Sequence, residues 1–183
     1  MMSVYRLLSV LLDYPTTEAL DALAAATGEA GGSLALVGRL DDEGAFSAAE
    51  RQTVARFVDG LGGLPEDEIQ MRYVQTFDLT AEHSLHLTHH LFGEEKTRGP
   101  ALIDLSEFYR SYGFEPDPRE LPDYLPLMLE FASTLDATER RIFLGDVLKV
   151  LSVLAANLEK AASPYAPLIR IVENHSALAT LAA

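Results

Sequence analysis

The sequence of 183 residues contains no cysteine. Without cysteine the chain has no disulfides, no thiolate zinc site, no iron–sulfur ligation and no cysteine nucleophile. This absence suits a protein of a reducing compartment. The chain is long enough to bury roughly 70% of the surface that it would expose when unfolded, so it needs no covalent cross-link to be stable.

Basic residues are scarce, because 14 lysines and arginines stand against 28 aspartates and glutamates and leave a net charge of −14. Such an excess of acids argues against nucleic acid and against an anionic membrane surface as partners. It would favour a basic partner, for example a positively charged peptide. Solubility alone explains the charge equally well, so composition leaves both interpretations open.

Long apolar runs are also missing, since no stretch approaches the roughly 18 uninterrupted apolar residues of a membrane-spanning helix. The run from Leu7 to Leu12, with Arg6 in front of it, resembles the apolar core of a signal peptide. The run is short, Asp13 ends it and no small-residue cleavage site follows. We therefore expect a cytoplasmic protein that does not insert into the membrane.

Motifs of the common enzyme classes do not occur in the sequence. The stretch GEEKTRG (93–99) has glycines around basic residues, but it lacks the Lys-Ser/Thr that follows the second glycine of a phosphate-binding loop. No predicted strand precedes it, and no GxSxG nucleophile elbow is present. The sequence thus offers no positive evidence for an enzyme, and a nucleotide-binding regulator that uses Lys96 and Arg98 is a weak alternative.

Apolar residues recur at helical spacing, and the alternation typical of strands is nearly absent. This pattern predicts an all-α protein, an irregular helical bundle of about eight to nine helices in one domain over 1–183. The acidic, proline-rich segment FEPDPRELPDY (114–124) is expected to be a hinge or a crossing between two groups of helices. The expected helices span residues 3–12, 17–28, 47–61, 65–78, 81–92, 99–112, 123–136, 138–162 and 165–181.

Local signals predict where several helices begin. Ser47 and Glu50 have the spacing of a capping box, and Pro65 is followed by three acids that suit the first turn of a helix. Thr138 is expected to cap the longest helix, 138–162, as the spine of the core. The stretch AGGSLALVG (30–38) is expected to be a loop with a short turn of helix.

Four of the five histidines lie in the stretch HSLHLTHH (83–90). On a helix over 81–92 these histidines and Glu82 fall in one arc of about 120°, which makes them its polar face. His86 and His90 have the i, i+4 spacing that brings two imidazoles to one zinc ion, but no third ligand is singled out. We favour a plain solvated face over a pH-responsive or partner-contacting surface, and both over a metal site.

The stretch LPDYLPLMLEF (121–131) has the form of a helix start after a linker. Asp123 is expected to be the N-cap, which leaves Pro126 in the first turn, where its missing N–H has no intrahelical acceptor to lose. Beside this acidic linker, several apolar side chains would also suit one wall of a groove for an amphipathic helix. They are Leu125, Leu127, Met128 and Phe131.

Taken together, four stretches resemble the respiratory nitrate reductase delta-subunit family. These proteins are molybdenum cofactor assembly chaperones within the all-helical redox-enzyme maturation chaperone superfamily. The resemblance is specific from Tyr73 to Phe131 and extends to YRLLSVLLDYP (5–15). The stretches are YVQTFDL (73–79), SLHLTHH (84–90), GEEKTRGPAL (93–102) and LPDYLPLMLEF (121–131).

The resemblance implies a non-catalytic, cytoplasmic protein of nitrate reductase assembly and nitrate assimilation. Such a chaperone binds the apo catalytic (alpha) subunit of respiratory nitrate reductase, including its N-terminal segment. It holds this unfolded or incomplete client until molybdenum cofactor is inserted and the client docks at the membrane, and it is absent from the final enzyme. It is expected to bind no cofactor stably, and cofactor-delivery proteins are possible further partners. A chaperone for another molybdoenzyme of the same class is the alternative.

The resemblance also implies a set of site residues. Asp123 and Tyr124 match a Pro-Asp-Tyr/His motif, Tyr73 and Thr76 to Asp78 match the TFD helix end, and Arg98 matches a basic loop. In that loop Glu94 and Lys96 depart from the family pattern, which keeps the charges but loses bidentate geometry. The expected peptide-binding residues are Tyr73, Phe77, Asp78, Arg98, Asp123, Tyr124, Leu125, Met128, Glu130 and Phe131.

These residues lead to a hypothesis of helix-in-groove recognition. The apolar face of the client segment would lie near Phe77, Leu125, Met128 and Phe131, while Asp123 and Glu130 would meet its basic side chains. The histidines occupy positions where relatives often have tyrosine. Since a phenol does not replace an obligatory metal ligand, this lowers the metal interpretation of His86 and His90 further.

Overall fold

The computed structural model describes residues 3–92 and 98–177. Over these residues the chain forms eleven α-helices, one 3₁₀ helix and no β-strand, so the predicted all-α fold is confirmed. The helices are α1 (Val4–Leu12), α2 (Thr17–Ala30), α3 (Ser33–Leu40), α4 (Ala48–Gly62), α5 (Glu66–Phe77), η1 (Ala81–His83), α6 (Leu87–Phe92), α7 (Arg98–Ser111), α8 (Leu125–Ala132), α9 (Ala137–Gly145), α10 (Leu148–Lys160) and α11 (Ala166–Ala177).

Two corrections raise the helix count above the expected eight to nine. The predicted helix 138–162 is two helices, α9 and α10, because the weak helix formers Gly145 and Asp146 interrupt it. The segment 30–38, expected to be mostly loop, carries most of α3. Gly31 and Gly32, with φ of 82° and 128°, turn the chain directly from α2 into this helix.

Two of the predicted helix starts are confirmed, whereas the predicted cap at Thr138 is wrong. Ser47 and Glu50 form the expected capping box at α4. Acids occupy the first turn of α5 after Pro65, as predicted. Thr138, however, is not a cap: Asp136 caps α9, and its side chain accepts hydrogen bonds from the N–H groups of Thr138 and Glu139.

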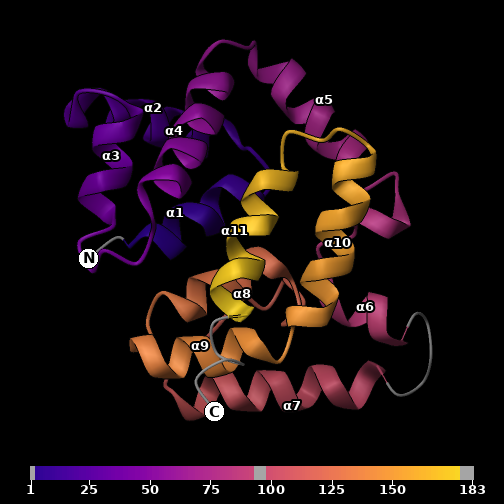
Figure 1. Ribbon diagram of the computed structural model, residues 1–183. Coiled ribbons are helices and arrows are strands. Elements are labelled where there is room, and N and C mark those ends of the chain that lie inside the picture. The colour runs from indigo at the N-terminus through magenta and orange to yellow at the C-terminus, as the bar shows by residue number, and fades with distance from the viewer. Residues whose placement is uncertain (1–2, 93–97, 178–183) are drawn as a thin grey trace.

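The core joins elements that lie before and after the linker 114–124. Helix α1 packs against α8, and α11 packs against α10, α9 and α4 (Figure 1). Most residues of α1 and α8 are buried, which agrees with the nearly continuous apolar sequence of both helices. The linker itself is non-helical between α7 and α8, and its role as a hinge stays a prediction.

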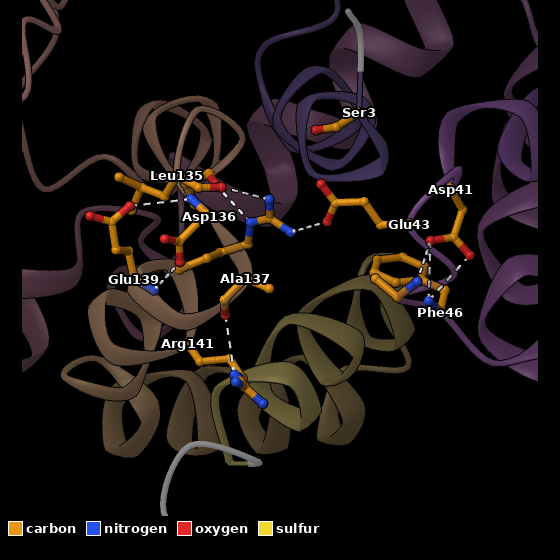
Figure 2. A network of polar contacts seen from close by, with 12 residues as sticks. Ser3, Asp41, Glu43, Phe46, Leu135, Asp136, Ala137, Glu139 and Arg141 are labelled. Atoms are coloured by element: carbon orange, nitrogen blue, oxygen red, sulfur yellow. Dashed lines mark hydrogen bonds and ion pairs between the residues drawn. The ribbon is translucent and has the colours of Figure 1, made fainter.

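A buried polar network fastens the loop after α3 to the α8–α9 turn (Figure 2). The Arg140 guanidinium, 4% exposed, donates to the carbonyl oxygens of Ala132 and Leu135 at 2.9 and 2.8 Å and pairs with Glu43 at 3.0 Å. The buried Asp41 carboxylate accepts hydrogen bonds from backbone N–H groups of the same loop. Because all these groups find partners, the network stabilises the junction of the two parts of the chain.

Candidate functional site

The histidine-rich stretch and the Pro-Asp-Tyr motif lie side by side in the fold. His86 and Tyr124 form an isolated antiparallel bridge. The Leu125 N–H donates to the Leu85 carbonyl at 2.8 Å, and the Leu87 N–H donates to the Asp123 carbonyl at 3.0 Å. These two backbone bonds hold the beginning of α6 against the beginning of α8.

The carboxylate of Asp123 is the centre of the site and is only 1% exposed. It accepts hydrogen bonds from the Thr88 N–H at 3.1 Å and the Thr88 hydroxyl at 2.5 Å. The Arg98 guanidinium and the His86 imidazole each lie 3.4 Å from it, and Arg98 Nε donates to the Thr88 hydroxyl at 3.0 Å. The network therefore ties α6, α7 and the start of α8 together.

The protonation of Asp123 follows from these contacts. Burial by itself raises the pKa of this carboxyl, but hydrogen bonds from His86 and Thr88 outweigh burial and lower the pKa to about 2. The group is thus a carboxylate at neutral pH. The prediction that Asp123 is the N-cap of α8 is wrong, because Tyr124 occupies that position and its side chain makes no capping hydrogen bond. Asp123 instead caps the first turn of α6, where it accepts a hydrogen bond from the Thr88 N–H.

Two tyrosines form the second part of the site. The hydroxyls of Tyr73 and Tyr124 lie 2.8 Å apart. Tyr73 also contacts the Leu12 carbonyl at 3.1 Å, and Tyr124 donates to the Asp13 carboxylate at 2.9 Å. Burial first, and then the nearby Tyr73 and Asp13, raise the pKa of Tyr124, so it keeps its proton and remains a donor. This chain of contacts fixes the end of α1 to α5 and α8.

A hollow of about 180 Å³ opens beside the two tyrosines. Four of the expected binding residues line it: Tyr73 and Phe77 on α5, Asp78 at the end of α5, and Tyr124. The remaining lining residues come from the turn after α1, the stretch before α6 and the linker. The full lining is Tyr14, Tyr73, Phe77, Asp78, Ser84, Leu85, His86, Glu120 and Tyr124.

The rim of this hollow combines acids with exposed apolar side chains. Asp78 and Glu120 are exposed and line the hollow. Tyr14 is 41% exposed, and Leu79 and Leu121, which directly follow the two rim acids in sequence, are 73% and 42% exposed. An acidic, partly apolar rim suits an amphipathic ligand that carries positive charge.

The apolar members of the expected site lie in the core instead of on an open groove wall. Leu125, Met128 and Phe131 are at most 2% exposed, and Phe77 is 6% exposed. Helix α8 packs against α1, Phe131 packs on Tyr109 and Phe143, and Phe77 packs on Tyr73 and Tyr165. These side chains therefore support the site from beneath, and the expected exposed wall is absent from this conformation. Glu130 is half-exposed and pairs with Arg6 at 2.5 Å. Direct client contact by these residues stays a prediction.

The predicted helix over 81–92, and with it the single histidine face, is wrong. A 3₁₀ turn and an extended segment precede the short α6, so the histidines point to different partners. His83 is buried and its Nδ1 lies 3.0 Å from the Thr76 carbonyl. His86 packs on Tyr124, with ring centroids 5.1 Å apart, and His90 Nε2 lies 2.8 Å from the Ser84 carbonyl.

Over residues 3–92 and 98–177, no three histidine, aspartate or glutamate side chains lie close enough together to bind one metal ion. His86 and His90, the weak candidates, contact different groups. The loop residues Glu94 and Lys96 lie outside the described part of the chain. Of that basic motif the structure places Arg98, which joins the Asp123 network.

Sequence reasoning missed several members of the site. No local signal singled out Thr88, yet its hydroxyl links Asp123 to Arg98. Asp13, Tyr14 and Glu120 were not singled out, although their acidic and aromatic character was visible. The contact of Asp13 with Tyr124 spans 111 residues of sequence, so no local pattern could have revealed it.

Fold and site together define an all-helical protein with an acidic, aromatic-lined hollow of the kind that suits binding. Comparison with known families gives the class a name. A sequence profile of the family described as "Nitrate reductase delta subunit" matches residues 43–170. The chain belongs to this nitrate reductase delta subunit family.

Three curated relatives illustrate the family. The chain is 34% identical over 122 residues, or 67% of its length, to the probable nitrate reductase molybdenum cofactor assembly chaperone NarJ of Bacillus subtilis. It is 35% identical over 63% of its length to the nitrate reductase molybdenum cofactor assembly chaperone NarJ of Escherichia coli. A nitrate reductase-like protein, NarX of Mycobacterium tuberculosis, is 32% identical over 92% of the chain.

The matched regions cover 66%, 49% and 24% of these three relatives, respectively. The chain thus spans part of each relative's length, from about a quarter to just under two thirds. A search of the described helices for a segment able to cross a membrane found none.

Proposed function

We propose that the chain is a system-specific assembly chaperone for a respiratory nitrate reductase. It binds the apo catalytic (alpha) subunit and holds it until molybdenum cofactor is inserted and the subunit docks at the membrane. In this proposal it acts in the cytoplasm, catalyses no reaction, binds no cofactor stably and is not part of the final enzyme. The observation that carries the proposal is the family match over residues 43–170, together with relatives named as molybdenum cofactor assembly chaperones.

The client contact that we propose includes the N-terminal segment of the catalytic subunit, bound at the rim of the tyrosine hollow. Asp78 and Glu120 would meet basic side chains of this segment, and Tyr14, Leu79 and Leu121 would meet its apolar face. The acidic character of the whole chain, −14 at neutral pH, would speed the encounter with a basic segment.

The affinity should permit release once the client is complete. A dissociation constant near micromolar, about −8 kcal/mol, suits capture followed by exchange better than a near-permanent complex. A contact made partly by exposed charges should also weaken as salt is added, because charges on a rim are screened over roughly 10 Å at moderate ionic strength.

Titration calorimetry with the N-terminal peptide of the client tests the proposal. Asp123→Ala is a poor test variant, because Asp123 is buried and its loss would disturb the fold. The double variant Asp78→Asn/Glu120→Gln changes only exposed rim charges and should weaken peptide binding by about three- to tenfold, given roughly 0.5 kcal/mol or more for each exposed pair.

The matched control is Asp104→Asn/Glu107→Gln on α7, which removes the same charge from exposed positions outside the hollow. The control should bind the peptide like the unmodified chain. Equal weakening in both variants would mean that net charge, and not the rim, attracts the peptide. Absence of binding to both the peptide and the apo subunit at tens of micromolar would overturn the chaperone proposal.

A further inference from the structure

A second hollow, larger and far more apolar, lies toward the beginning of α5, whereas the tyrosine hollow lies toward its end. Residues of the end of α4, the beginning of α5 and the α10–α11 connection line a volume of about 420 Å³. Its floor consists of aliphatic and aromatic side chains that the mechanism proposed above does not use. They are Phe57, Leu61, Leu64, Ile69, Tyr165 and Leu168.

The charged residues that line this hollow are two arginines, in a chain with twice as many acids as bases. Arg56 donates to the Thr53 hydroxyl at 3.2 Å, and no carboxylate of the described residues lies within ion-pair distance of it. Arg72 pairs with Glu68 at 2.5 Å, one turn back on α5, and about half of its side chain is exposed. Such an exposed pair contributes little and can be exchanged for another anion.

We propose that this hollow is a binding pocket for a small apolar monocarboxylate. Its volume falls in the range of small-molecule sites, roughly 300–1,000 Å³. The alkyl or aryl part would fill the space over Leu61, Ile69 and Leu168, and the carboxylate would lie at the rim between Arg56 and Arg72. A guanidinium binds a carboxylate through two parallel N–H groups. The single neutral oxygen of an alcohol cannot accept both in this geometry, and an ammonium group has no acceptor.

A free acid fits the lining better than a peptide segment does. A helix with its side chains is about 10–12 Å wide, too wide for a pocket of this volume. An extended peptide would bury amides, which need hydrogen-bond partners. Apart from the two arginines, the lining offers only the side chains of Thr53 and Tyr165 as polar groups. An apolar monocarboxylate has a single polar group, its carboxylate, and the two arginines can donate hydrogen bonds to that group.

Three probes of equal chain length separate charge from apolar character: octanoate, octanol and octylammonium. Calorimetry or ligand-observed NMR on the full chain should give the order octanoate, then octanol, with octylammonium weakest. Arg56→Gln/Arg72→Gln should weaken octanoate by about tenfold and leave octanol unchanged, as for the loss of charge-assisted hydrogen bonds. The control Arg119→Gln/Arg141→Gln removes the same charge from exposed positions outside the pocket and should leave octanoate binding unchanged.

A steric variant tests the location independently. Gly60 lines the pocket, and a Cβ added there meets no atom within 4 Å, so Gly60→Leu should fold and occupy part of the pocket. We expect it to abolish octanoate binding. Gly38→Leu, on α3 and also in open space, is the matched control and should bind normally. Octanol bound as tightly as octanoate, or octanoate binding unaffected by Gly60→Leu in a folded protein, would overturn the proposal.

Discussion

The two hollows along α5 are built on different physical principles. Toward the end of α5, Tyr73 and Asp78 line the small tyrosine hollow, where the hydroxyls of Tyr73 and Tyr124 bond to each other and Tyr124 also bonds to the Asp13 carboxylate. Toward the beginning of α5, Ile69 and Arg72 line the larger pocket, where contacts are mostly apolar. Tyr165 connects the two, since it lines the pocket and packs on Tyr73 and Phe77 at centroid distances of 6.1 and 4.8 Å.

This difference determines how each region responds to change. The tyrosine hollow and the neighbouring Asp123 network are assembled from groups far apart in sequence, held by directional bonds that fail when one partner is lost. The apolar pocket rests mostly on α4 and α5, which are adjacent in sequence, and on non-directional packing. We therefore expect substitutions in the first region to cost stability and small substitutions at the edge of the second to be tolerated.

The largest effect is expected for Asp123→Ala. Removing a carboxylate that is 1% exposed leaves Thr88 and Arg98 without their buried partner, which should lower the free energy of unfolding by about 3–5 kcal/mol. Urea unfolding followed by circular dichroism measures it. Asp117→Ala, which removes an exposed partner of Arg119, should leave the midpoint unchanged. A loss below about 1 kcal/mol for Asp123→Ala would mean that the backbone bonds alone hold the junction.

The acid sensitivity of the fold should be traceable to the same carboxyl. The pKa of Asp123 is about 2 in the folded chain against an ordinary value of 3.8. The folded state thus gains stability that is complete above pH about 4 and is lost as pH falls toward about 2, an effect of roughly 2 kcal/mol. Since other paired carboxylates titrate in this range, the measured quantity is the difference between the unmodified chain and Asp123→Asn.

That difference should be constant from neutral pH down to about 4 and should shrink below it, because a protonated carboxyl resembles the amide. A difference that stays constant down to pH about 2 would contradict the assigned pKa of Asp123.

Tyr124→Phe should have a smaller effect. It removes the hydroxyl that donates to Asp13 and lies 2.8 Å from the Tyr73 hydroxyl. We expect a loss of about 1.5 kcal/mol in unfolding free energy, the low end for one hydrogen bond with a charged acceptor. Tyr14→Phe changes a hydroxyl on the same hollow for which the structure shows no hydrogen bond among the described residues, and it should be neutral. Equal effects of both variants would contradict the proposed role of the Asp13 contact.

The fold class and several helix starts could be predicted from local chemistry. The capping box of Ser47 and Glu50 involves residues three apart, so the sequence contains all of its parts. The extended segment before α6 could not be predicted in the same way, because its backbone partners are residues 123–125. Helical periodicity over 81–92 was a chance arrangement that this tertiary pairing overrides.

The residues of the site could be predicted from the sequence only in part, for the same reason. Family resemblance pointed to Tyr73, Asp123 and Tyr124, which all lie at the site. It could not distinguish exposed from buried members, because the burial of Met128 and Phe131 follows from packing of α8 on α1 and on aromatic side chains of α7 and α9. Residues with a local signal were found, whereas those defined by a distant partner, such as Asp13, were not.

Gly60→Ala should give the smallest effect and one of opposite sign. Gly60 lies within α4 at the edge of the apolar pocket, with helical backbone and open space where a Cβ would stand. Alanine there should raise the free energy of unfolding by about 0.5–1 kcal/mol, since it restricts the unfolded chain. The control Gly31→Ala, at a φ of 82°, should instead destabilise the protein. A loss on Gly60→Ala would show that the pocket edge, like the tyrosine hollow, depends on close contacts, and the contrast between the two hollows would fail.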